Sequence, residues 1–300
     1  MKLSEATRRF LEKKIQELSE RTGIPVETLW DRYTRYKQDI RVTLSDVSPD
    51  EEAVIAMNSF ICRTLASQGT KTILFIPIGF GFERTTRNGT KMSRIYGLYR
   101  EENDESYRPG VLIGRGEDAK VWAEVQLFYA YRIKVSGSKP GVFWVTPDTV
   151  FDNDQAAMVG TTVNDKLRLL VRMGVKKFTL REIYDNISRR DENGFVDDRD
   201  IRGLEGVIVA VRSGKRQDGS EWFQYMISDP DLAMEKDDIV TEDGRVIPRQ
   251  LTVWVPRPVF HNYPVGTQVF IYGHVIDRED DVPYMNAIGL IPIMIPGGGV

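Results

Sequence analysis

The sequence predicts an α+β fold with two five-stranded β-barrels in tandem, a small N-terminal helical bundle and a helical connector. Two long segments consist of short apolar runs separated by turn residues, with no long helical pattern between the runs. That spacing is typical of antiparallel β structure and argues against a parallel sheet of βαβ units. We therefore expect a helical unit at 1–69, a first barrel at 70–151, the connector at 152–201 and a second barrel at 202–300.

The first 69 residues predict three short amphipathic helices, since their apolar residues recur at helical spacing. Gly23 ends the first of them. Pro25 suits the first turn of the second, because its missing N–H would be unpaired there anyway. Ser48 and Glu51 predict a capping box at the start of the third. Together these helices predict a small bundle that ends near residue 69.

The segment 70–151 predicts β-strands joined by hairpin turns. Asn88-Gly89 is a hairpin signal, because glycine adopts positive φ at no steric cost. Ser136-Gly137 and Pro140-Gly141 indicate a second hairpin. The order is a hairpin with a basic tip, a third strand, a short connection and a final hairpin. The same order recurs in 202–300, so we expect two copies of one barrel.

The connector predicts two further helices. The first spans 162–173 and stops at Gly174, and the second opens with a capping box from Thr179 to Glu182. The residues expected to face inward from the first helix are Val163, Leu167, Leu170 and Val171.

The last hundred residues contain five β-type runs. Asp218-Gly219 marks a tight turn after the first run. In the third run, Val253 and its alternate neighbours share one face, so Trp254 points away from the barrel interior. A hairpin, a third strand, a Pro-Val-Gly turn and a final hairpin is the order of a five-stranded OB barrel.

The stretch 203–293 resembles an OB domain of the replication protein A family of single-stranded DNA-binding proteins, in its archaeal form. The matching pieces are GVIVAVRSGKRQDGSEWFQYMISDP, LTVWVP and YPVGTQVFIYGHVIDRED. In that family a third-strand aromatic stacks on a base, and Trp254 falls on that position, with Tyr284 near a second one. The resemblance implies a protein that coats exposed strands in replication, repair or recombination. Some archaeal members carry a Cys/His zinc finger near the C-terminus, which the single cysteine here excludes.

Charge is unevenly distributed along the chain. The total is −3, but 70–151 carries +3 and 202–300 carries −5. Phosphate binding needs a local positive face rather than a positive total. Charge therefore favours the first barrel for nucleic-acid binding, whereas the second barrel carries the recognisable stacking position.

Binding of single strands needs cations along the backbone and flat rings that stack on bases. The basic and aromatic residues expected to bind nucleic acid are Arg84, Arg87, Lys91, Tyr96, Arg100, Arg115, Trp122, Trp144, Arg212, Lys215, Arg216, Trp222, Tyr225, Trp254, Arg257, Tyr272, Arg278 and Tyr284. Because successive side chains of a strand point to opposite faces, Trp222 and Gln224 lie on one face and Phe223 and Tyr225 on the other. This alternation does not decide which pair lies inside the barrel.

Enzymatic and metal-dependent functions find little support in the sequence. No phosphate-cradling GxxxxGK[ST] motif and no recognisable Ser/His/Asp spacing is present. One cysteine and two histidines leave few metal constellations. We expect no catalysis and no cofactor.

The N-terminus lacks the apolar core of a signal peptide, and no apolar run approaches the length of a membrane span. The expected location is cytoplasmic and chromosome-associated.

Two alternatives stay open. The chain could be a structural OB subunit of a larger nucleic-acid-processing complex, or it could bind RNA, since OB domains bind both nucleic acids. Expected partners are single-stranded DNA, other replication or repair proteins and sister OB subunits, with no membrane partner.

Overall fold

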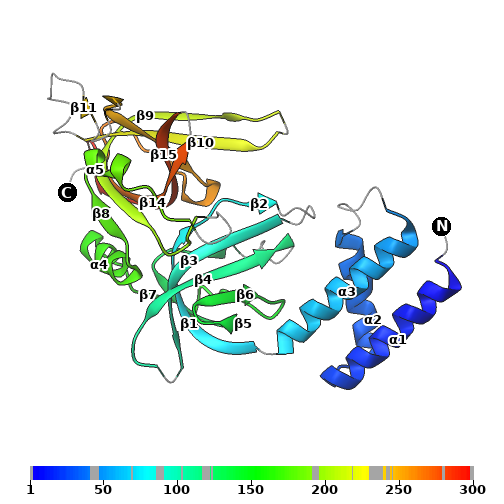
Figure 1. Ribbon diagram of the computed structural model, residues 1–300. Helices are drawn as coiled ribbons and strands as arrows, with labels where there is room; N and C mark the ends of the chain where they lie inside the picture. Colours follow the sequence, from blue (N-terminus) through cyan, green and yellow to red (C-terminus); the bar gives the residue numbers. More distant parts are fainter. Residues whose placement is uncertain are drawn as a thin grey trace.

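The computed structural model describes residues 3–40, 47–68, 70–85, 91–102, 104–116, 122, 124–190, 196–217, 219–229, 239–240, 244, 246–278 and 281–297. A helical bundle, a first barrel and a second barrel follow one another along the chain (Figure 1). The bundle contacts the first barrel through α3 and β5, while the second barrel packs on a different side of the first.

The N-terminal bundle consists of α1 (Glu5–Thr22), α2 (Val26–Ile40) and α3 (Pro49–Gln68). Gly23 caps α1 in the left-handed conformation, with φ of 70°. The predicted capping box of α3 is present: the backbone N–H of Glu51 donates to Ser48 Oγ over 3.3 Å, and the N–H of Ser48 donates to Glu51 Oε2 over 3.1 Å. Fully buried side chains hold the three helices together, among them Ile15, Leu29 and Met57.

The first barrel, called barrel 1 below, is built from β1 (Thr70–Phe80), β3 (Lys91–Glu101), β4 (Arg108–Arg115), β5 (Tyr129–Lys139) and β6 (Val142–Val145). Its strand order is β1-β3-β4-β6-β5, and a β5–β1 pairing closes it. β4 and β6 are parallel, and the other barrel pairs are antiparallel. Two short strands extend the sheet: β2 (Arg84–Thr85) beside β3, and β7 (Ala157–Met158) beside β5.

The predicted turns of barrel 1 have different outcomes. Pro140 and Gly141 form the β5–β6 turn, with φ of 75° at Gly141. The expectation that Ser136 and Gly137 also lie in a turn is wrong, because both residues belong to β5, where the register with β6 shifts. Asn88-Gly89 lies outside the described residues.

The second barrel, barrel 2, repeats this topology with β9 (Arg202–Lys215), β10 (Glu221–Ser228), β13 (Gln250–Val255), β14 (Gln268–Arg278) and β15 (Asp281–Met294). Its order is β10-β13-β15-β14-β9, closed by β9–β10, and β13 and β15 form the parallel pair. Gly219, with φ of 80°, lies in the predicted β9–β10 turn, whereas Asp218 lies outside the described residues. The short pair β11 (Ile239–Val240) and β12 (Val246–Ile247) forms a separate ribbon. The shared order confirms two five-stranded OB barrels within an α+β fold.

The connector contains α4 (Val163–Met173), β8 (Lys176–Phe178) and α5 (Leu180–Asp185). Thr179 and Glu182 form the predicted capping box of α5, and Gly174 ends α4 as predicted. The inward orientation expected for Val171 is wrong, because its side chain is 73% exposed. Successive helical residues lie about 100° apart. The inward stripe therefore runs through Leu170, as predicted, and Met173, both buried, while Val163 and Leu167 are partly buried against the same cluster.

The two barrels pack directly on each other through an inter-barrel core, in which Ile76 and Ile78 of β1 meet Phe270 and Tyr272 of β14 and Ile288 of β15. The Tyr272 hydroxyl donates to the backbone carbonyl of Ile78. Space is tight here: a Cβ on Gly79 would lie 2.7 Å from the Ile288 carbonyl oxygen. This buried contact fixes how the outer faces of the barrels are placed relative to each other. No helix in the described part of the chain is long and apolar enough to cross a membrane.

Candidate nucleic-acid interface

The outer face of β10 and β13 in barrel 2 presents two tryptophans side by side. Tyr225 and Val253 point into the barrel and are fully buried, so alternation places Trp222 and Trp254 outside. Both indoles are half-buried, with ring centroids 5.8 Å apart and planes at 63°. This edge-to-face arrangement is one that aromatic pairs prefer. The second and third strands of an OB barrel, together with two loops, form the surface on which this fold takes oligonucleotides.

Gly214 of β9 makes room for the indole of Trp222. The two residues are register partners, and a Cβ on Gly214 would lie between 2.7 and 2.9 Å from three atoms of the indole. A larger residue at position 214 would therefore displace the ring. Glycine at this position therefore leaves open the space in which the Trp222 indole lies over the β9 backbone.

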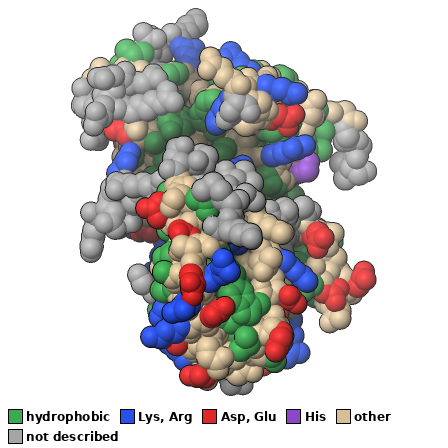
Figure 2. All heavy atoms as spheres, turned by 90° about the vertical axis from the view of Figure 1, so that its right-hand side faces the viewer, with side chains coloured by type: hydrophobic (Ala, Val, Ile, Leu, Met, Phe, Trp, Pro, Cys, Tyr) green, Lys and Arg blue, Asp and Glu red, His purple; other side chains and the backbone are tan. Residues whose placement is uncertain are grey.

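Exposed cations lie on the strand and turns next to the tryptophan pair. Arg212 is exposed and pairs in register with Gln224, the β10 neighbour of Trp254 on the outer face. Lys215 and Arg216 are exposed at the tip of the β9–β10 hairpin. Arg257 is 82% exposed, with its Nε 3.7 Å from Glu221. In the upper half of Figure 2, where barrel 2 faces the viewer, Lys and Arg side chains lie around hydrophobic ones and few acidic side chains are visible.

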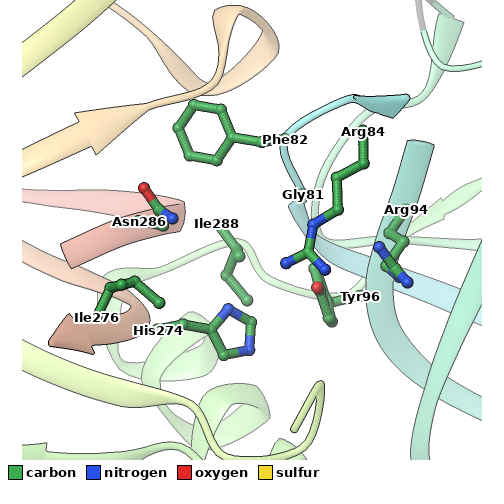
Figure 3. A pocket seen from close by; sticks show the side chains of 9 residues that line it. All are labelled: Gly81, Phe82, Arg84, Arg94, Tyr96, His274, Ile276, Asn286 and Ile288. Atoms are coloured by element: carbon green, nitrogen blue, oxygen red, sulfur yellow. The ribbon is translucent and has the colours of Figure 1, made fainter. Parts of the chain in front are cut away.

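The same outer face continues across β15 to a cavity between the barrels. Asn286 pairs in register with Trp254, so it lies one strand beyond the tryptophans. Asn286 also lines the cavity, together with His274 of barrel 2 and Arg84, Arg94 and other residues of barrel 1 (Figure 3). Arg84 is exposed, whereas Arg94 is mostly buried, with its Nε 3.3 Å from Asp198.

Barrel 1 does not offer the equivalent face. Leu98 of β3, Val111 and Ile113 of β4 point out of the barrel but are buried in one apolar cluster with Leu170 and Met173 of α4. Helix α4 contacts β3, β4 and β15. It therefore covers the β3–β4 face of barrel 1, which corresponds to the open β10–β13 face of barrel 2. Although 70–151 carries net positive charge, its β3–β4 face is covered, which the sequence does not reveal.

At the edge of that covered face, Trp144 of β6 is half-buried, and the guanidinium carbon of Arg115 lies 4.2 Å from its ring centroid. A cation this close to an aromatic ring is held by cation–π attraction. Two predicted residues therefore meet here, on a patch separate from the β10–β13 face.

Four predicted aromatics lie in the core, where no base can stack on them in this conformation. Tyr225 is fully buried and donates its hydroxyl to the His261 carbonyl, and burial raises the pKa of Tyr225 to about 12. Tyr272 belongs to the inter-barrel core. Tyr96 is buried and donates to Asp198 over 2.8 Å. Trp122 is buried in a turn before β5 rather than on a strand.

The remaining predicted residues are scattered. Lys91 Nζ lies 2.9 Å from Glu83, and Arg100 donates to the Asp104 carbonyl over 3.1 Å. Tyr284 of β15 is half-buried. Arg87 lies outside the described residues, and the side chain of Arg278 is likewise not described.

Of the residues that line the inter-barrel cavity, the sequence analysis singled out Arg84 and Tyr96 and missed the others, among them Phe82, His274 and Asn286. No spacing signal marks them, because Phe82 follows β1 in barrel 1 while His274 and Asn286 lie on the paired strands β14 and β15 of barrel 2, and only the packing of the two barrels brings them together. Within the described ranges, no group of three or more His, Cys, Asp or Glu side chains could hold a metal ion.

No protein-family model matches the chain, and no curated protein matches it. Among solved structures, the N-terminal domain of the PriB protein from Thermoanaerobacter tencongensis is similar at 15% identity, covering 31% of this chain and 96% of that one, with a TM-score of 0.22. The single-stranded DNA-binding protein from Thermus aquaticus is similar at 9% identity over 77% and 95% of the two chains, with a TM-score of 0.23. The p202 HIN1 structure in complex with a 12-mer double-stranded DNA is similar at 10% identity over 74% and 92%, with a TM-score of 0.33. Likenesses this distant carry no argument about function, and the OB topology rests on the strand order described above.

Proposed function

We propose that this chain is a single-stranded DNA-binding protein that catalyses no reaction and binds its strand on the outer face of barrel 2. The observation that carries the proposal is the Trp222–Trp254 pair on the open β10–β13 face. Flat aromatic rings at a strand surface stack on bases of any sequence, each contributing roughly 1–3 kcal/mol. The barrel does not need these outward-facing rings to fill its core, since other residues fill the interior.

The cations beside the pair supply the second requirement. Arg212, Lys215 and Arg216 lie along one side of the tryptophans, and Arg84 lies beyond Asn286 toward barrel 1. A strand that crosses β10, β13 and β15 passes these side chains in turn. Guanidinium groups suit this role because their planar fork pairs with phosphate.

The finer assignment is part of the same proposal. The resemblance of 203–293 to the archaeal replication protein A family supports a role in replication, repair or recombination, on the chromosome in the cytoplasm. The proposed units are 1–69, 70–151, 152–201 and 202–300; the end of α3 supports the first of these boundaries and the start of β9 supports the last.

A fluorescence titration tests the proposal. Oligo(dT) is added to the full chain at several salt concentrations while tryptophan emission is followed. If three to five cations contact phosphates, log K falls with log salt with a slope of about −2 to −3.5. Lack of binding at low salt would overturn the proposal. Competition by RNA and duplex DNA of matched length then separates DNA from RNA and from duplex binding.

A further inference from the structure

The cavity between the barrels contains an unpaired buried hydrogen-bond acceptor. It has a volume of about 50 Å³ and lies one strand beyond Trp254, on the face already described. His274 is only 5% exposed, and its Nε2 has no hydrogen-bond partner among the described residues. In Figure 3, the imidazole of His274 lies near the guanidinium of Arg84 at the centre of the view.

The chemical state of His274 follows from its other nitrogen. The ring makes a hydrogen bond with the backbone of Asp198. Because Nε2 has no partner, this bond falls to Nδ1, which donates to the Asp198 carbonyl. Burial lowers the pKa of His274, so the ring is neutral near pH 7. A neutral imidazole protonated at Nδ1 has a lone pair at Nε2. His274 therefore presents an acceptor to the cavity.

The groups around this acceptor are mostly donors. Arg84 donates only, and the Asn286 amide both donates and accepts. The Tyr96 hydroxyl is engaged with Asp198. An acceptor beside donors is complementary to the edge of a nucleobase, which carries N–H groups next to carbonyl or ring-nitrogen acceptors. A phosphodiester has no donor for Nε2, so it suits this site less well.

We propose that one unstacked nucleobase of the bound strand places its edge in this cavity. His274 Nε2 accepts from a base N–H, while Arg84 and Asn286 pair with the neighbouring acceptors. The cavity is large enough for the edge only, and the rest of the ring stays at the mouth beside Phe82, which also lines the site. This proposal rests on the proposed function and adds to it: binding depends on base chemistry at one nucleotide, and is not governed by stacking alone.

The test compares two homopolymers of equal length, oligo(dT) and oligo(N3-methyl-dT). The methyl group removes the imino N–H and leaves a ring that still stacks. The full chain should bind oligo(dT) about 5- to 150-fold more tightly, the range expected when a buried acceptor loses its donor. His274→Phe keeps a ring in place and removes the acceptor, so it should bind both homopolymers equally.

His261→Phe is the matched control, because His261 is the other histidine and is exposed. It should keep the full preference for oligo(dT). Asn286→Leu is a second variant that reduces the preference even if His274→Phe fails to fold. Equal binding of both homopolymers by the unmodified chain would overturn the base-edge proposal while leaving single-strand binding intact. Competition by inorganic phosphate that disappears in His274→Phe would also overturn it, in favour of a phosphate site. Failure to bind either homopolymer would contradict both proposals.

Discussion

Replacing Trp254 by alanine separates a binding role from a packing role for this outward-facing ring. The variant removes a half-buried indole on the outer face of barrel 2 and leaves the barrel interior unchanged. Trp30 of α2 provides a matched control: it is also half-buried and forms an edge-to-face pair, with Tyr33, at the same centroid distance of 5.8 Å. It lies in the helical bundle, away from barrel 2.

The expected magnitudes follow from the geometry. Loss of a stacked base costs roughly 1–3 kcal/mol, which weakens oligo(dT) binding about 5- to 150-fold for Trp254→Ala. A fully buried Trp→Ala change costs about 3–5 kcal/mol of unfolding free energy, so a half-buried ring costs on the order of 2 kcal/mol. Trp30→Ala should lose a similar amount of stability, because its pair and burial match, and should leave DNA affinity unchanged.

Urea denaturation and oligo(dT) titration by fluorescence anisotropy measure both quantities on the same samples. The result that refutes the reasoning is unchanged affinity in Trp254→Ala with a stability loss equal to that of Trp30→Ala. In that case Trp254 is a packing residue, and the β10–β13 face is not the binding surface.

Three further predictions test the fold around the site. Leu170→Ala should cost about 2–5 kcal/mol of unfolding free energy, whereas Val171→Gln should change it by less than about 0.5 kcal/mol. Denaturation curves measure both. Equal losses would mean that Val171 faces inward, as the sequence suggested. Tyr272→Phe should lower the free energy of unfolding by about 1–3 kcal/mol, because the Ile78 carbonyl loses its donor, and should leave the affinity for oligo(dT) unchanged. A loss of affinity without a loss of stability would instead place Tyr272 in contact with the bound DNA. Burial lowers the pKa of His274 in the folded chain, so the unfolded state binds more protons and stability should fall as pH drops through about 6.5. Urea midpoints from pH 7.5 to 5.5 should fall less steeply in His274→Phe, and parallel slopes would contradict this origin.

The sequence predicted helix ends and caps, because certain residue types are strongly favoured at those positions. Gly23 and Gly174 end their helices in the left-handed conformation, and Thr179 with Glu182 caps α5. The outward direction of Trp254 followed from strand alternation. These features depend on neighbours in sequence, which is why they could be read without the structure.

What could not be predicted depends on which surfaces meet. Alternation opposes Trp222 to Tyr225 but cannot tell inside from outside, and only the closed barrel buries Tyr225. Tyr272 looks like an accessible strand aromatic until the second barrel packs on the first. The covering of β3 and β4 by α4 likewise depends on long-range packing, so the charge count favoured barrel 1 although its β3–β4 face is covered.

Hydrogen–deuterium exchange of the full chain, with and without saturating oligo(dT), tests the central claim most directly. If the strand binds on the outer face of barrel 2, binding slows exchange in β10, β13 and the β9–β10 hairpin, while β4 and β6 of barrel 1 exchange as before. Protection confined to β4 and β6, or no change in β10 and β13 at saturation, would contradict it.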